Sequence, residues 1–196
     1  MPSTIRTMLL AAMLAMSSGV ASAGPLEDAD AAYKRGDYAT AISLLRPLAD
    51  QGDAKAQAAL GNAYSTGDGV AKNDTEAVKW YRLAAEQGFA PAQTNLGYMY
   101  SNGTGVPKND TEAVEWFRKA ADQGEAGAQY FLGNMYDKGQ GVPENAVQAY
   151  KWFNIAAAQG NAMAKASKAI IEKKMTSEQI AEAQKLSAEW KPTKQP

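Results

Sequence analysis

Residues 54–64 read Ala-Lys-Ala-Gln-Ala-Ala-Leu-Gly-Asn-Ala-Tyr, residues 90–100 read Ala-Pro-Ala-Gln-Thr-Asn-Leu-Gly-Tyr-Met-Tyr, and residues 126–136 read Ala-Gly-Ala-Gln-Tyr-Phe-Leu-Gly-Asn-Met-Tyr. The three segments begin 36 residues apart and share Gln, Leu, Gly and Tyr at i, i+3, i+4 and i+7. This spacing places the four side chains on one face of a helix. A fixed period of this length is typical of stacked-repeat proteins, so the sequence predicts a helical solenoid.

A second helix is expected after each of these segments. Its face carries Ala, an aromatic pair and two further Ala at i, i+3, i+4, i+7 and i+8, as in Ala77, Trp80, Tyr81, Ala84 and Ala85. Large rings beside small side chains favour close helix packing, so we expect the tryptophans to lie in the core. A Gly within a helix costs about 1 kcal/mol relative to Ala. Three such glycines in register therefore indicate that the second helix lies too close for a Cβ atom: Gly61, Gly97 and Gly133.

The segments between the helices carry the residues that begin and end helices. Asn73, Asn109 and Asn145 each precede a Glu or Gln by three residues, which resembles a capping box. A Gln-Gly pair recurs every 36 residues, and its Gly suits the left-handed position that follows a helix. These glycines are Gly52, Gly88, Gly124 and Gly160.

A Gly-x-Gly-Val segment separates the two helices of each repeat, at 67–70, 103–106 and 139–142. A phosphate-binding loop is the alternative interpretation, but no strand is expected before the segment and no Lys-Ser/Thr follows it. Its repetition favours a turn that is anchored by Val. Asn73 and Asn109 also begin Asn-Asp-Thr glycosylation acceptor patterns, which the capping role explains as well.

The two ends of the predicted stack differ from its middle, as the capping units of a solenoid should. Residues 24–52 predict a shorter helix pair. Residues 161–196 predict capping helices, the last of which begins with a capping box of Thr176 and Gln179. This last helix has a single apolar stripe, which is expected to cover the open end of the stack. A loosely attached tail is the alternative.

Residues 1–23 have the three parts of a secretory signal peptide. Arg6 lies in a short first part, an apolar run covers residues 8–16, and Ala21-Ser22-Ala23 has the small-x-small pattern of a cleavage site. The apolar run is shorter than the roughly 20 residues that a membrane-spanning helix needs. We therefore expect cleavage near Ala23, a periplasmic or secreted protein, and no stable membrane insertion afterwards.

Composition argues against several classes of function. The chain of 196 residues contains 20 Lys and Arg against 21 Asp and Glu, so it lacks the excess of positive charge that nucleic-acid partners require. It has no Cys and no His, so it lacks disulfides, the commonest metal ligand and the usual general base near neutral pH. We accordingly expect no catalytic residues, no bound metal and no cofactor, and we do not expect an enzyme.

The repeated pattern resembles the Sel1-like repeat, a relative of the tetratricopeptide repeat with a longer loop. The resemblance covers residues 53–160 three times over, whereas residues 24–52 are more similar to an ordinary tetratricopeptide unit. It implies an all-α fold, namely a right-handed α/α superhelical solenoid of antiparallel helix pairs. Members of this family serve mainly as adaptors, and some resemble periplasmic regulators that hold a membrane sensor in check. A cysteine-rich branch is linked to β-lactam binding, but this chain has no Cys.

In similar repeats the concave wall is formed by residues beside the repeated stripe of the first helix. An Asn there can pair with both groups of an extended peptide backbone, and a Tyr offers rigid contact area with a polar tip. An ordinary polar helix face that binds nothing is the alternative. The candidate binding residues of this concave groove are Lys55, Asn62, Thr94, Tyr98, Tyr130 and Asn134.

Two classes of function remain open. The first is an exported protein–protein interaction module, either an adaptor or a regulator, that binds a protein or peptide partner in the groove. An envelope sensor or an assembly component would be such a partner. The second is an envelope enzyme or binder that acts on β-lactam-like or peptidoglycan-derived ligands, which as an enzyme would need an activated nucleophile or a pair of carboxylates.

Overall fold

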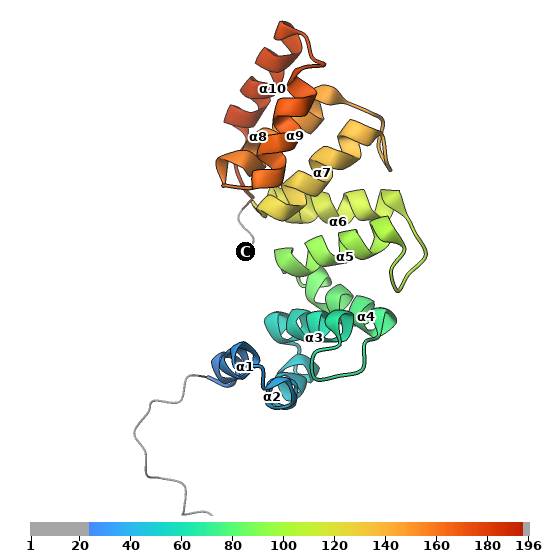
Figure 1. Cartoon of the computed structure of the whole chain (residues 1–196), viewed down its shortest axis with the longest axis vertical. Coiled ribbons are helices and arrows are strands. Elements are labelled where there is room, and N and C mark those ends of the chain that lie inside the picture. The colour runs from blue at the N-terminus through green and yellow to red at the C-terminus, as the bar shows by residue number, and fades with distance from the viewer. Residues whose placement is uncertain (1–23, 194–196) are drawn as a thin grey trace, which may run out of the picture.

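The structure is a computed structural model that describes residues 24–193, so the predicted signal peptide lies outside the described residues. This part of the chain folds into ten helices without a strand, stacked as a solenoid (Figure 1). The helices are α1 (Pro25–Lys34), α2 (Tyr38–Asp50), α3 (Ala54–Thr66), α4 (Asp74–Glu86), α5 (Ala90–Asn102), α6 (Asp110–Asp122), α7 (Ala126–Lys138), α8 (Ala146–Ala158), α9 (Ala162–Glu172) and α10 (Ser177–Glu189). The prediction of an all-α solenoid of helix pairs is confirmed.

Each of the first four helix pairs consists of an odd-numbered helix packed on the even-numbered helix that follows it. Each even-numbered helix then packs on the next odd-numbered one, so every interior helix contacts both its own pair and the neighbouring pair. The loops α5–α6 and α7–α8 project on the same side of the stack in Figure 1. Because the helix contacts repeat with the sequence period, equivalent side chains meet in each repeat.

The in-register glycines are explained by aromatic rings of the second helix, as predicted. A Cβ atom added at Gly133 would lie 2.6 Å from Cε1 of Phe153, and one at Gly61 would lie 2.6 Å from Cδ1 of Tyr81. Contacts this short do not occur in folded proteins, because van der Waals repulsion rises steeply below about 3.5 Å. The absent side chain therefore lets each ring lie directly on the backbone of its partner helix.

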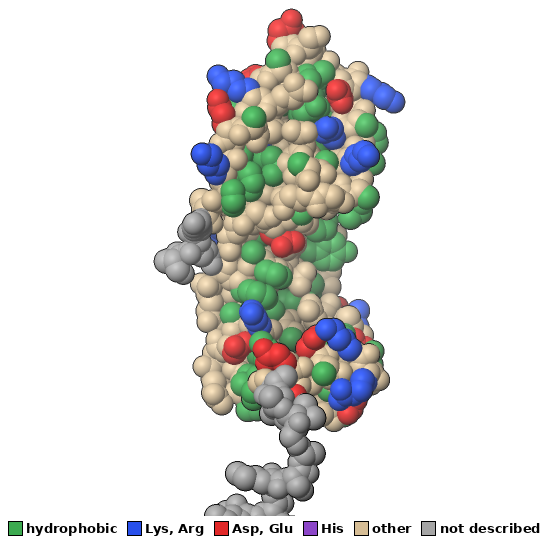
Figure 2. All heavy atoms as spheres, turned by 90° about the vertical axis from the view of Figure 1, so that its left-hand side faces the viewer, with side chains coloured by type: hydrophobic (Ala, Val, Ile, Leu, Met, Phe, Trp, Pro, Cys, Tyr) green, Lys and Arg blue, Asp and Glu red, His purple; other side chains and the backbone are tan. Residues whose placement is uncertain are grey.

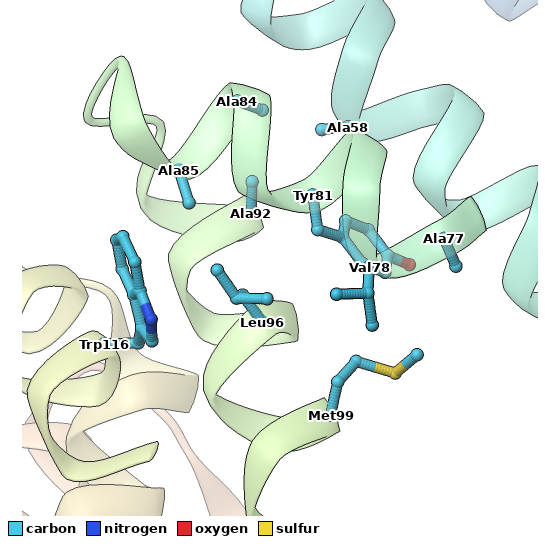
Figure 3. Close-up of a cluster of buried hydrophobic side chains, with 10 residues drawn as sticks. All are labelled: Ala58, Ala77, Val78, Tyr81, Ala84, Ala85, Ala92, Leu96, Met99 and Trp116. Carbon is cyan, nitrogen blue, oxygen red and sulfur yellow. The ribbon is translucent and has the colours of Figure 1, made fainter. Parts of the chain in front are cut away.

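The core consists of four hydrophobic clusters, each of which joins side chains from neighbouring helix pairs. Figure 3 shows one cluster, in which Trp116 of α6 joins side chains of α3, α4 and α5. Trp116 and Trp152 are buried, which confirms their expected place in the core. Trp80 is only partly buried, and the guanidinium of Arg46 covers its ring at 5.5 Å from the centroid.

The second helices of the three long repeats keep only one half of the predicted capping box, because the backbone N–H of each Asn donates to the carbonyl of Tyr64, Tyr100 or Tyr136 and not to the Glu or Gln side chain. The side chain of Asn73 accepts a hydrogen bond from the backbone N–H of Glu76 at 3.1 Å, and Asn109 and Asn145 make the same contact. Thr176 makes a complete capping box with Gln179, with bonds in both directions. These bonds satisfy backbone donors that have no partner within the helix.

Both glycines of the Gly-x-Gly segment adopt left-handed backbone conformations, at φ +69° for Gly103 and Gly105. A Cβ atom on Gly105 would meet the backbone oxygen of Asp74, in the first turn of α4. The segment therefore packs against the second helix of the preceding repeat, and Val106 lies partly buried beside it. This arrangement confirms the interpretation as a turn that Val anchors.

Buried glutamines join each repeat to the next. Gln93 of α5 is 3% exposed, and its Nε2 donates to the backbone oxygen of Ala85 at 3.0 Å. The same oxygen accepts a hydrogen bond from the backbone N–H of Gly88. One carbonyl group therefore bonds both to the Gly that ends α4 and to a side chain of α5. The Oε1 of Gln93 in turn accepts from Nε2 of Gln123 at 2.7 Å. We call this arrangement the glutamine relay, and it recurs with Gln57 and Gln87, and with Gln129 and Gln159.

A second repeated contact was missed by the sequence analysis. Arg46 donates to the hydroxyl of Tyr64 at 2.7 Å, and the contact recurs between Arg118 and Tyr136 at 3.1 Å. The Arg lies on the second helix of one repeat and the Tyr on the first helix of the next. The repeated Tyr therefore has a partner in the preceding repeat, which the spacing within one repeat does not reveal.

The last helix does not extend the stack in the usual way, since α10 packs on α8, the helix that α9 also contacts. Ala183 is fully buried, and the indole of Trp190 meets that of Trp152 edge-on with ring centroids 6.1 Å apart. The backbone N–H of Thr193 donates to the oxygen of Asp122 at 2.8 Å. The chain after α10 is therefore held against the end of α6.

We predict opposite effects for Gly→Ala at two positions of α7. Gly133→Ala should destabilise the protein by about 1–3 kcal/mol, because the methyl group overlaps the ring of Phe153. Gly127→Ala should be neutral or stabilise it by up to about 1 kcal/mol, because its nearest contacts lie at 3.4 and 3.8 Å and Ala favours the helix. Urea unfolding measures both, and equal effects would contradict the packing argument.

The glutamine relay gives a second prediction. Gln129→Met keeps the side-chain length but removes the bonds to Ala121 and Gln159, so it should cost about 1–3 kcal/mol in the free energy of unfolding. The control is Gln148→Met in the first turn of α8, which should change stability by less than about 0.5 kcal/mol. Comparable losses from both variants in urea unfolding would show that the relay does not contribute.

Candidate binding surface

The stacking of α3, α5 and α7 places the predicted groove residues in a row. Nδ2 of Asn95 donates to Oδ1 of Asn62 at 3.3 Å, which joins α5 to α3. A Cβ atom at Gly127 would lie 3.8 Å from the methyl carbon of Thr94, which joins α7 to α5. We call the exposed face of the odd-numbered helices from α3 to α9 the A-helix wall.

At the N-terminal end of the wall, Lys55 and Asn62 line a pocket of about 490 Å³ between α1, α2 and α3. Both side chains are exposed. The structure thus brings these two predicted residues to one site. The complete lining is Leu26, Ala29, Asp30, Tyr33, Leu45, Lys55, Ala59, Asn62 and Thr66.

The amide of Asn62 has a fixed orientation. Its Oδ1 accepts from the hydroxyl of Tyr81 at 2.7 Å as well as from Asn95, so Nδ2 is the group that it presents to a ligand. Burial raises the pKa of Tyr81 to about 12, so its hydroxyl keeps its proton at neutral pH. Asn62 is therefore not free to pair with both groups of a peptide, whereas Asn134 has no hydrogen-bond partner among the described residues.

The middle of the wall is aromatic. Tyr98 is 48% exposed, and its ring lies 5.8 Å from that of Phe131, which also contacts Tyr130 at 5.4 Å. Phe131 stacks on the buried ring of Phe117 at 5.1 Å, so the cluster is anchored in the core. The sequence analysis included Tyr98 and Tyr130 but missed Phe131, which lies one residue beyond the predicted position.

The wall continues onto α9, which the sequence analysis also missed. Met163 and Ile170 are 58% and 60% exposed. They follow Gly127 and Asn134 by 36 residues each, so they occupy the same positions of the first helix (163 − 127 and 170 − 134). The 36-residue period would have found them, although α9 lacks the Leu-Gly-x-x-Tyr pattern.

Two other wall positions are less available than their spacing suggests. Ala58, which has the same register as Thr94 and Tyr130, is buried. The hydroxyl of Thr94 donates to the backbone oxygen of Ala90 at 3.0 Å, so its polar group is already used within α5. The exposed surface of the wall is therefore polar at Lys55 and Asn62 and carries large exposed apolar side chains at Tyr98, Met163 and Ile170.

Shifted ionisation along the chain has local causes. The hydroxyl of Tyr33 donates to Asp68, which raises the pKa of Tyr33 to about 12 and lowers that of Asp68. On α6 and α8, burial raises the pKa of Asp122 and lowers that of Lys151. Within residues 24–193, no group of three Asp or Glu side chains is placed to hold a metal ion.

The face seen in Figure 2 shows how charge is distributed along the stack. Charged side chains gather toward its two ends, and mainly hydrophobic and uncharged side chains occupy the middle. No helix within residues 24–193 is long and apolar enough to cross a membrane.

Asn62 and Asn134 provide a matched test, because they occupy the same position in different repeats. Asn62→Ala should cost about 1–2 kcal/mol in the free energy of unfolding, since the hydroxyl of the buried Tyr81 loses its acceptor. Asn134→Ala should change it by less than about 0.5 kcal/mol. Thermal or urea unfolding measures the difference, and equal stabilities would contradict the role assigned to Asn62.

The comparisons with known proteins agree with this geometry. The family model described as Sel1 repeat matches residues 29–53, 54–89, 90–125 and 126–161, the first of which falls on the N-terminal helix pair. No curated protein matches the chain.

Two solved structures are similar over most of the chain. A Sel1 repeat protein from Oxalobacter formigenes is 40% identical, with a TM-score of 0.70 over 74% of this chain and 60% of its own. The protein c5321, described as a protective antigen present in uropathogenic Escherichia coli strains displaying an SLR fold, is 36% identical, with a TM-score of 0.74 over 83% of this chain. The chain spans 60% and 38% of the length of these two proteins. The repeated matches and the shared helix-pair stack show that the chain belongs to the Sel1 repeat family.

Proposed function

We propose that this chain is an exported interaction module, an adaptor or regulator, that binds a protein or peptide partner along the A-helix wall. One observation carries the proposal. The large exposed side chains Tyr98, Met163 and Ile170 lie on this wall, at positions where the residue type differs from repeat to repeat. Apolar side chains that gather on one surface mark interaction sites.

The difference between the repeated scaffold residues and the variable wall residues supports this function. The repeated Gln, Leu, Gly and Tyr side chains are occupied with packing or with hydrogen bonds inside the scaffold. The wall residues differ from repeat to repeat, as at Asn62, Tyr98 and Asn134. A partner can therefore be selected at these positions without a change in the scaffold. Aromatic anchors such as Tyr98 are the residue type that contributes most to protein interfaces.

The alternative function, an envelope enzyme or binder for β-lactam-like or peptidoglycan-derived ligands, lacks comparable support. Hydrolysis by such an enzyme requires a nucleophile beside a base, or two carboxylates that flank the bond to be cleaved. The predicted wall residues supply an ammonium group, amides, a hydroxyl and two phenols. Export rests on the signal-peptide pattern of residues 1–23.

Photo-cross-linking in the cells that produce the protein tests this proposal. A photoreactive residue at position 98 or 170 should capture a partner, whereas the same residue at Leu83 should not. Leu83 is a matched control because it is 45% exposed but lies on α4, away from the wall.

The double variant Tyr98→Ser/Ile170→Ser should lose most of its capture from position 134, by about tenfold or more, while its helical content and unfolding midpoint stay near those of the parent. Leu83→Ser should capture normally. Equal capture from position 83 and from the wall, or capture that the double variant leaves intact, would refute the assignment.

A further inference from the structure

The segment after α10 crosses the edge of the stack at which the Gln-Gly turns lie. Thr193 donates twice to the carbonyl oxygen of Asp122, from its backbone N–H at 2.8 Å and from Oγ1 at 3.1 Å. A Cβ atom on Gly124 would lie 3.6 Å from Cβ of Pro192 and 4.0 Å from Cη2 of Trp190. The segment therefore lies in a hollow of this edge in the way that a bound peptide would.

A second hollow of the same kind lies one repeat earlier, between the end of α4 and α6, with a volume of about 450 Å³. Trp116 belongs to it, in the register of the Trp152 that Trp190 contacts. The first hollow is lined by Gly124, Ile155, Ala158 and Gln159, and the second by the residues 36 positions earlier, Gly88, Lys119, Asp122 and Gln123. The two hollows are therefore equivalent sites in consecutive repeats.

The second hollow also repeats the backbone acceptor. Asp122 is the last residue of α6, so its carbonyl group has no donor within the helix and accepts from Thr193 instead. Glu86 is the last residue of α4, in the same register, and its carbonyl oxygen accepts no hydrogen bond from residues 24–193. A second extended segment can therefore be held there in the same way.

The charge of the second hollow favours a basic segment. Lys119 and Asp122 replace the apolar Ile155 and Ala158 of the first hollow. Together with Glu86 they give this hollow two carboxylates and one ammonium group. Glu86 is exposed and has no ion-pair partner within residues 24–193.

The sequence that follows Thr193 matches this site. Thr193 itself lines the second hollow. Residues 194–196 read Lys-Gln-Pro and lie outside the described residues. Three extended residues span about 10 Å, which is the distance between the axes of packed helices. They are therefore long enough to cross from α6 toward α4.

We propose that residues 194–196 occupy the second hollow. Lys194 pairs with the carboxylate of Glu86, and Pro196 lies against Gly88 as Pro192 lies against Gly124. The segment after α10 is then an intramolecular peptide ligand that joins α8, α6 and α4. This inference goes beyond the proposed function and does not depend on it, because the hollows belong to the edge of the stack and not to the A-helix wall.

Disulfide cross-linking in the full chain tests the inference, since the chain has no Cys of its own. Disulfides form only where two Cα atoms come within about 7 Å. Under mild oxidation, Gln195→Cys combined with Lys119→Cys should cross-link within one chain at least about tenfold faster than Gln195→Cys combined with Arg118→Cys. Mass spectrometry of the digested, unreduced protein measures both rates.

Arg118 is a matched control for Lys119. Both side chains are exposed, both substitutions remove one positive charge, and both positions lie about one helical turn before Asp122. Lys119 lines the second hollow, whereas Arg118 donates to the hydroxyl of Tyr136 in the next repeat. A segment that was tethered at Asp122 but not seated in the hollow would reach both positions equally.

Two substitutions of Thr193 test the attachment. Thr193→Pro removes both donors to Asp122, so it should slow the cross-link between positions 195 and 119 by about tenfold or more. Thr193→Ser keeps both donors and should cross-link like the parent pair. Glu86→Gln removes the proposed ion pair and should slow the cross-link at low salt, where the attraction between exposed charges is strongest. Unfolding curves establish that each variant is folded.

Equal cross-linking at positions 118 and 119, or a rate that Thr193→Pro leaves unchanged, would overturn the inference. Cross-links between two chains in place of one would also overturn it and would assign the hollow to a second copy. Partner capture from position 98 should be the same in Thr193→Pro as in the parent. The failure of this inference and the failure of the proposed function are therefore distinguishable.

Discussion

The stack depends on a buried amide that has to satisfy both of its polar groups. Gln93 donates to the oxygen of Ala85, which already holds the N–H of Gly88, and accepts from Gln123. An unpaired amide group in this position would cost about 1–3 kcal/mol, so the side chain is restricted to one orientation. The relay therefore aligns three elements at once, namely the end of one helix, the start of the next and the turn that closes the following pair. Hydrophobic packing alone would allow small slips between repeats, and this directional contact opposes them.

The scaffold and the wall obey different constraints. Inside the stack, Gly133 has no room for a methyl group because Phe153 covers it, so this position tolerates little change. On the wall, Tyr98 and Ile170 contact solvent over about half of their surface, and substitution there affects stability less. Asn62 is subject to both constraints, because it lines the pocket and also accepts a hydrogen bond from the hydroxyl of Tyr81.

Local and repeated features could be predicted from the sequence, and contacts between different positions of different repeats could not. The cap at Asn73 depends on residues three apart, and the role of Gly97 follows from its recurrence, so both were predictable. The bond between Arg46 and Tyr64 joins residues 18 apart on two repeats, and no pattern within one repeat indicates it. Ile170 was missed because α9 keeps the period but has lost the signature residues. The pocket depends on how α1 packs beside α3, which spacing alone does not determine.

The constant offsets of the relay have a consequence for how such chains change in length. Every interior Gln reaches a carbonyl eight residues earlier and a second Gln 30 residues later. Deletion or duplication of a whole 36-residue unit leaves each of these offsets intact, whereas loss of one residue within a first helix turns the amide away from both partners. Stacks of this kind can thus be shortened or extended by whole repeats. The pocket stays at the N-terminal end and α10 still covers the C-terminal end.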